Sequence, residues 1–179
     1  MILEIPKNAE TILHILEKAG YEAYVVGGCV RDSILGRSPD DWDITTSAKP
    51  EQVKALFHRT VDTGLQHGTV TVLMEKEGYE VTTYRVDGEY EDGRHPKEVT
   101  FTASLEEDLK RRDFTINAMA YNPSSGLVDL FGGLEDIERK IIHDFFGFRR
   151  VFGGENTDGG SFVGHWLRRI ILFQRQRIV

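Results

Sequence analysis

Two consecutive runs rich in β-branched residues place the strongest constraint on the fold of this chain. Residues 69–74 (TVTVLM) and residues 79–85 (YEVTTYR) both have the composition of strands, and a short connection that ends in Glu77 and Gly78 separates them. Strands joined by so short a connection pair antiparallel, because a parallel pair needs a crossover of about a dozen residues. The sequence therefore predicts a β-hairpin and an antiparallel part of a sheet.

Helical patterns alternate with further short strands around this hairpin. Apolar residues recur at helical spacing after Asn8 and stop at Gly20, and Ser104 and Glu107 form a capping box for a helix that begins at Leu105. Other helices are predicted over 30–35, 50–57 and 113–120, and other strands over 23–26, 41–45 and 128–133. This mixed order predicts an α+β fold, with helices flanking a mixed sheet, rather than a doubly wound parallel sheet.

The composition fits a globular chain that acts in the cytoplasm. Of its 179 residues, 40% are hydrophobic and 28% are charged. The single cysteine, Cys29, excludes an internal disulfide and a zinc site built from several cysteines. No apolar run approaches the roughly 20 residues that cross a bilayer, and Glu4, Pro6 and Lys7 interrupt any secretory signal. We therefore expect a cytoplasmic protein without a membrane partner.

The distribution of charge divides the chain near residue 143. The net charge of −7 argues against a nucleic-acid partner, but carboxylates that bind Mg²⁺ would add to this count. Residues 1–142 hold 16 Lys and Arg against 26 Asp and Glu, whereas residues 143–179 hold 6 against 3 and carry 6 of the 10 Phe. We predict a head domain over 1–142 and an atypical tail over 143–179.

Two adjacent glycines follow the predicted strand 23–26. Gly27 and Gly28 could let backbone N–H groups approach phosphate oxygens, and Arg31, one helical turn later, could reach the same phosphates. Gly28 and Arg31 are therefore candidate nucleotide-binding residues. The alternative is a plain tight turn before a helix.

Asp41 and Asp43 are the candidate metal ligands. Residues two apart on a strand point to the same face, so the two carboxylates would converge. Such a pair is costly to bury without a cation, and Mg²⁺ would supply both the charge and the chemistry for phosphoryl transfer. The alternative is a solvated turn, because the preceding residues Ser38 and Pro39 favour one.

These segments belong to an ordered series of motifs. The series comprises 27–32 (GGCVRD), 35–37 (LGR), 41–44 (DWDI), 64–70 (GLQHGTV), 79–85, 92–96 (DGRHP), 105–118 and 129–133 (DLFGG). It resembles the signature of bacterial class II CCA-adding enzymes and their poly(A) polymerase relatives, in the DNA polymerase β nucleotidyltransferase superfamily. The resemblance covers residues 8–142 and implies a polymerase β-like head with a mixed, mainly antiparallel sheet.

The resemblance also implies roles for individual residues. Asp41 and Asp43 would hold Mg²⁺, and Glu80, on a neighbouring strand, would be a third catalytic acid unless it is simply an exposed strand glutamate. Arg112 would contact the triphosphate or ribose of the incoming nucleotide. The alternative for Arg111 and Arg112 is that they are solvated or pair with the upstream acids Glu106, Glu107 and Asp108. The loop 89–95 would be a lid.

The function implied by the resemblance is CCA addition: transfer of CMP and AMP from CTP and ATP to a tRNA 3′ end, with release of pyrophosphate. Poly(A) addition is the alternative, because both activities share this head. In the family a helix that selects the incoming base follows residue 142, and residues 143–179 do not match it, as a frameshift or a short variant would explain. A head that binds nucleotide without catalysis is therefore a third possibility, and the sequence leaves the oligomeric state open.

Overall fold

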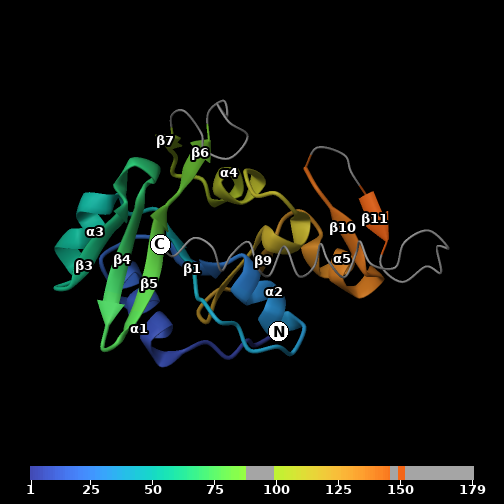
Figure 1. Ribbon diagram of the computed structural model, residues 1–179, viewed down its shortest axis with the longest axis horizontal. Coiled ribbons are helices and arrows are strands. Elements are labelled where there is room, and N and C mark those ends of the chain that lie inside the picture. Colours follow the sequence, from blue (N-terminus) through green and yellow to red (C-terminus); the bar gives the residue numbers. More distant parts are fainter. Residues whose placement is uncertain (88–98, 146–148, 152–179) are drawn as a thin grey trace.

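The computed structural model describes residues 1–87, 99–145 and 149–151, and within these residues a seven-stranded sheet organises the fold (Figure 1). The strand order is β3-β4-β5-β2-β1-β8-β9. Their bounds are β1 Ala23–Val26, β2 Ile44–Thr46, β3 Thr60–Gly64, β4 Thr69–Met74, β5 Glu77–Thr83, β8 Met119–Asn122 and β9 Gly126–Asp129. β2 and β5 pair parallel, and every other neighbouring pair in this sheet is antiparallel. The predicted α+β fold with a mixed, mainly antiparallel sheet is confirmed.

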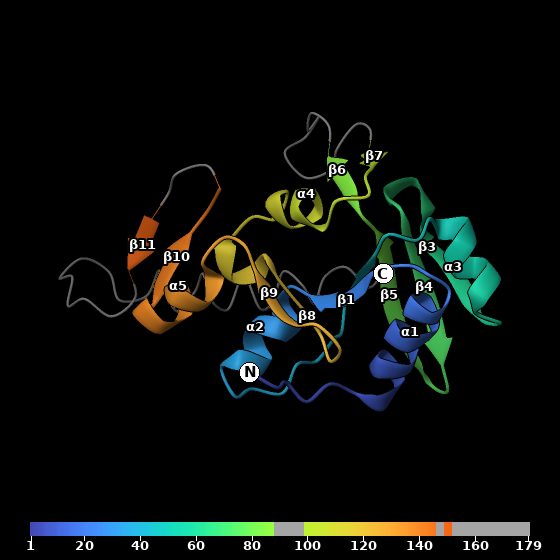
Figure 2. The same cartoon turned by 180° about the vertical axis from the view of Figure 1, so that it is seen from behind.

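Helices lie on both sides of the sheet. Figures 1 and 2 show α4 on the side opposite α1 and α2, with α3 beside the β3–β4 end. The helices are α1 Lys7–Lys18, α2 Gly28–Ile34, α3 Pro50–Leu56, α4 Leu105–Lys110 and α5 Gly133–Arg139, with short 3₁₀ turns η1 Leu65–His67 and η2 Thr115–Asn117. Two small antiparallel pairs join β6 Arg85–Asp87 to β7 Val99–Phe101 and β10 Ile141–His143 to β11 Arg149–Val151. No helix in the described part of the chain has the length and apolar character to cross a membrane.

The main core fills the space between the sheet and the helices α1, α2 and α3. Val25, Ile44 and Val81 are neighbours in register on three adjacent strands, and all three are buried. They pack with the apolar stripe of α1, which includes Ile12 and Leu16. This face of the sheet is thus closed to solvent and forms part of the hydrophobic core.

The opposite face carries the next residue along each strand and has a different character. Thr45 of β2 and Thr82 of β5 are paired on it, and a smaller apolar cluster around Val26, Leu109 and Ala120 lies beside them. Polar side chains such as Thr45 and Thr82 therefore share this face with a small apolar cluster.

Several predicted elements have different bounds in the structure. The hairpin of β4 and β5 is confirmed, but its turn is Glu75 and Lys76, and Glu75 adopts φ 55°. The predicted helix over 113–120 is wrong, because η2 ends at Asn117 and the rest of that segment enters the sheet as β8. Sheet pairing to β1 overrides the local helical pattern there.

Two helix starts are also resolved in detail. Ser104 Oγ accepts a hydrogen bond from the backbone N–H of Glu107, but the Glu107 carboxylate accepts from the Thr102 hydroxyl, so only half of the predicted capping box is present. Asp129 Oδ1 and Oδ2 accept from the backbone N–H groups of Gly133 and Leu134 at 2.9 and 2.8 Å, which caps α5. The predicted lid 89–95 and most of the predicted tail lie outside the described residues, and the domain boundary near 143 stays a prediction.

Candidate active site

The connection between β1 and α2 requires a glycine at position 27. Gly27 has φ 85° and ψ −132°, a conformation open to glycine and to very few other residues. A Cβ built on Gly27 would also lie 3.1 Å from Nη1 of Arg112. Gly28, the predicted phosphate contact, is buried as the first residue of α2. The close approach of the Arg112 guanidinium to Gly27 was not foreseen from the sequence.

Arg31 connects α2 to η2. Its Nε and Nη2 donate to the two carboxylate oxygens of Asp32 at 3.0 Å each, and its Nη1 donates to Oδ1 of Asn117 at 2.6 Å. The side chain is 6% exposed. These contacts fix the turn next to Gly27, and direct phosphate binding by Arg31 stays a prediction.

Asp41 and Asp43 lie just before β2 rather than within a strand. The prediction of a strand over 41–45 was wrong at this end, because β2 begins at Ile44. The backbone of Asp43 nevertheless continues the pairing to β1, since its carbonyl accepts from Val26 N–H at 3.0 Å. Asp43 is half-buried and Asp41 is exposed.

Two electrostatic effects show which groups the Asp43 carboxylate faces. Burial first, and then the charge of Asp43, raise the pKa of the Cys29 thiol to about 12. Burial lowers the pKa of the Arg112 guanidinium, whereas the negative charge of Asp108 and, more weakly, that of Asp43 act to raise it. Cys29 Sγ donates to the carbonyl of Val26 at 3.3 Å, so the thiol is a buried, protonated neighbour of the site and not a nucleophile.

Glu80 is placed on the strand next to Asp43. The parallel register pairs Ile44 with Val81, so one step back along both strands sets Asp43 beside Glu80. Glu80 is exposed and lies on the same face as Thr82, two residues later on β5. The predicted neighbouring-strand position of this acid is thereby confirmed, and its catalytic role stays a prediction.

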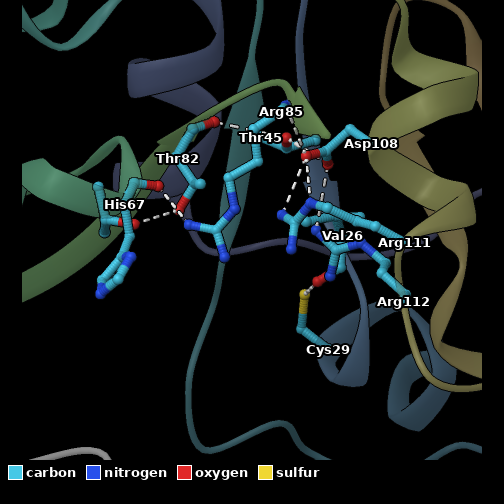
Figure 3. Close-up of polar contacts among 10 residues, drawn as sticks. Val26, Cys29, Thr45, His67, Thr82, Arg85, Asp108, Arg111 and Arg112 are labelled. Atoms are coloured by element: carbon cyan, nitrogen blue, oxygen red, sulfur yellow. Dashed lines mark hydrogen bonds and ion pairs between the residues drawn. The ribbon is translucent and has the colours of Figure 1, made fainter. Parts of the chain in front are cut away.

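Asp108 contacts both arginines of the site (Figure 3). Its carboxylate is fully buried and lies 2.9 Å from Nη2 of Arg111 and 3.4 Å from Nη2 of Arg112. The two arginine side chains are 16% and 18% exposed. The interpretation of Arg111 and Arg112 as solvated is therefore wrong, and the alternative of pairing with an upstream acid is confirmed for Asp108.

Two further donors reach Asp108 from the sheet side of the site. Thr45 Oγ1 donates to Oδ2 at 2.9 Å, and the backbone N–H of Arg85 donates to Oδ1 at 3.3 Å. Burial alone would raise the pKa of Asp108, but Arg112 and Arg111 outweigh it and leave that pKa below its usual value. Asp108 and Thr45 were not predicted as site residues. Asp108 could have been found because it lies four residues before Arg112, and Thr45 because it lies two residues after Asp43.

The donor set just before β2 fits a hard divalent cation. Asp41 and Asp43 offer carboxylate oxygens, and Mg²⁺ is bound in many enzymes by one or two carboxylates together with substrate phosphates. Among residues 1–87, 99–145 and 149–151, no three His, Cys, Asp or Glu side chains gather into a complete metal site.

Comparison with known proteins identifies the family of this head domain. Residues 23–143 match the model of the poly A polymerase head domain. The chain belongs to this family.

Named relatives agree with this assignment. The chain is 57% identical over 144 residues to a CCA-adding enzyme of Leuconostoc mesenteroides, a match that covers 79% of this chain and 36% of the relative. A crystal structure of the Bacillus stearothermophilus CCA-adding enzyme in complex with CTP matches with 50% identity and a TM-score of 0.69, covering 76% of this chain and 32% of that one.

A more distant neighbour is bound to RNA. The Thermotoga maritima CCA-adding enzyme complexed with tRNA matches with 25% identity and a TM-score of 0.60, covering 79% of this chain and 33% of that one. The chain thus spans about a third of the length of the relatives it matches.

Proposed function

We propose that this chain is the catalytic head of a tRNA nucleotidyltransferase, which transfers CMP and AMP from CTP and ATP to the 3′ end of tRNA. The 3′-hydroxyl oxygen attacks the α-phosphorus of the nucleotide, the bond from that phosphorus to the bridging oxygen breaks, and pyrophosphate leaves. The hydroxyl proton passes to solvent or to a nearby carboxylate. We expect this reaction to take place in the cytoplasm, as the sequence predicts.

The observation that carries the proposal is the closeness of an anionic and a cationic group beside Gly27. Asp43 lies just before β2, and the Arg112 guanidinium lies against Gly27, close enough to Asp43 for their charges to interact. A nucleotide with bound cation needs both signs of charge, since the carboxylates hold the cation and the guanidinium contacts phosphate or ribose oxygens.

The residues of the site would divide the work as follows. Asp41 and Asp43 would hold Mg²⁺, and Glu80 would add a third negative charge from β5. When bound, Mg²⁺ activates the attacking hydroxyl and stabilises the negative charge of the leaving pyrophosphate. Gly28 and Arg31 would shape the turn that receives the phosphates, and Arg112 would orient the triphosphate or the ribose.

The relatives support both substrates of the proposed reaction. One similar enzyme has a crystal structure in complex with CTP and another is complexed with tRNA, and the matches cover 76% and 79% of this chain. The curated relative from Leuconostoc mesenteroides carries the name CCA-adding enzyme. Because this chain covers about a third of these proteins, base selection and the grip on tRNA would depend on segments beyond the described head.

An incorporation assay tests the proposal. The full 179-residue chain is incubated with Mg²⁺, a tRNA that lacks its CCA end, and labelled CTP or ATP. We expect CMP to be added first and AMP only afterwards.

Each other outcome has a defined meaning. Repeated AMP addition to an RNA with an arbitrary 3′ end would show poly(A) synthesis instead, an activity that the name of the family also covers. Mg²⁺-dependent CTP binding without any incorporation would show a nucleotide-binding head that is not itself a catalyst.

A further inference from the structure

The buried carboxylate of Asp108 is shared between two arginines. Arg111 and Arg112 both form ion pairs with it, and two neutral donors, Thr45 Oγ1 and Arg85 N–H, also contact it. One carboxylate therefore faces two guanidinium groups. A buried charge of this kind persists only if it is paired and hydrogen-bonded, so each donor counts.

The two arginines use Asp108 differently. Arg111 places both Nε and Nη2 near Oδ1, at 3.0 and 2.9 Å, which is a close two-point contact. Arg112 reaches Oδ2 through Nη2 alone, at 3.4 Å, which is long for a hydrogen bond. Among the described residues, its buried Nε–H has no hydrogen-bond acceptor.

The guanidinium of Arg112 lies beside the turn at Gly27. A Cβ built on Gly27 would be 3.1 Å from Nη1, and the charge of Asp43 acts on the same guanidinium. Within the described part of the chain, Arg112 is thus held by Asp108 through Nη2 alone, while Nη1 lies beside the turn and the side chain keeps 18% of its surface exposed. An arginine that were purely structural would be expected to have all its buried donors satisfied.

We infer that Asp108 is a positioning residue, which holds the Arg112 guanidinium over Gly27 so that its unused donors meet the incoming nucleotide. This inference rests on the proposed function, because it assigns the partly exposed guanidinium of Arg112 a nucleotide oxygen as an acceptor. Asp108 itself is fully buried, so it would act through Arg112 and not by direct contact with a nucleotide.

Thr45 connects the Asp108 carboxylate to the sheet. Its hydroxyl fixes Oδ2, the carboxylate oxygen that Arg112 uses, and Thr45 lies two residues after Asp43 on the continuation of the same chain segment. The positions of Arg112 and of Asp43, the proposed metal ligand, therefore both depend on β2. Their separation is set by the sheet rather than by a flexible loop, which is the arrangement that preorganised sites require.

A double-mutant cycle on nucleotide binding tests the inference. The affinity of the full chain for CTP with Mg²⁺ is measured by titration calorimetry for wild type, Asp108→Asn, Arg112→Ala and the double variant. We expect Asp108→Asn to weaken binding about tenfold, the equivalent of roughly 1.4 kcal/mol. In the Arg112→Ala background the same substitution should change affinity by no more than about twofold, because the residue through which it acts is gone.

The controls separate positioning from a general loss of stability. Asp62→Asn makes the same chemical change in the exposed ion pair between Asp62 and Lys54, and it should leave affinity unchanged. If Asp108→Asn does not fold, Thr45→Val replaces it, since that variant removes one hydrogen bond to Asp108 and keeps every charge. Thr45→Val should weaken CTP binding about threefold in wild type and have no effect without Arg112.

A second readout needs no nucleotide at all. In the NMR spectrum of the free chain, an ordered guanidinium gives separate Nη resonances, whereas a freely rotating one gives averaged signals. We expect the Arg112 signals to be separate in wild type and averaged in Asp108→Asn.

The outcomes are distinguishable. Equal weakening of CTP binding by Asp108→Asn with and without Arg112, or unchanged Arg112 signals, overturns the inference. If wild type binds no CTP, the proposed function fails, and the NMR comparison alone decides whether Asp108 orders Arg112.

Discussion

Replacing Gly27 by alanine should damage both the fold and the nucleotide site, and its two effects can be separated. The φ of 85° at Gly27 lies where a residue with a side chain is strained. Backbone strain of this kind costs about 1–3 kcal/mol per residue. For a chain of this size we expect the melting temperature to fall by about 2–4 °C for each kcal/mol.

The second effect of Gly27→Ala falls on Arg112. The new Cβ would lie 3.1 Å from Nη1, whereas favourable contacts between heavy atoms lie at about 3.5–4.0 Å. The guanidinium must therefore retreat by about half an ångström or give up its 3.4 Å contact with Asp108. A displaced charge-assisted donor should weaken CTP binding by about tenfold.

Gly36→Ala is the matched control for this prediction. Gly36 also has a positive φ, of 69°, but a Cβ built on it would have no heavy atom within 4 Å. It should lose about 1–2 kcal/mol of stability from backbone strain alone and keep its affinity for CTP. Melting curves and calorimetric titrations of both variants make the comparison. Equal CTP affinity in Gly27→Ala and Gly36→Ala would refute the placement of Arg112 over this turn.

Two further predictions concern the stability of the head. The pKa of Asp108 is lowered in the fold, so its stabilising contribution is complete above the unfolded pKa of about 3.9 and is lost as the pH falls through the lower folded value. Below about pH 4, the free energy of unfolding in urea should therefore depend less on pH in Asp108→Asn than in wild type. The same dependence of unfolding free energy on pH in both proteins would contradict this. Gly133→Ala places a Cβ 2.5 Å from the carbonyl oxygen of Thr115 and should lower the free energy of unfolding by about 1–3 kcal/mol or more. Gly64→Ala, whose nearest contact is 3.4 Å, should cost less than about 1 kcal/mol, and equal losses in the two glycine variants would show that the Thr115 contact is not rigid.

Much of the sheet could be predicted from local sequence pattern. The hairpin of β4 and β5 and the strand β1 carry β-branched residues between turn signals, so the alternation of side chains alone indicates them. The prediction failed at η2 and β8, because the helix predicted over 113–120 gives way to a strand that pairs with β1 and β9. Long-range pairing of this kind is not encoded in a short window.

The candidate site was predictable in its acids but not in its supporting contacts. The spacing of Asp41 and Asp43 suggested a metal pair, although the inference relied on a strand that in fact begins at Ile44. Two partners of Asp108, Thr45 and Arg85, lie 63 and 23 residues away from it along the chain, and only the fold brings them together. A resemblance of motifs names the residues of such a site, whereas the structure shows which of them hold the others in place.

The most direct test of the central claim is Mg²⁺-dependent incorporation of labelled CMP into tRNA lacking its CCA end, compared between wild type and a variant with both Asp41→Ala and Asp43→Ala. Because Asp41 is exposed and Asp43 is half-buried, the double variant should keep its fold and its melting temperature to within a few degrees. We predict that wild type incorporates CMP and that the double variant shows no incorporation above background. Undiminished incorporation by a folded double variant would contradict the assignment of these two carboxylates as the catalytic metal ligands.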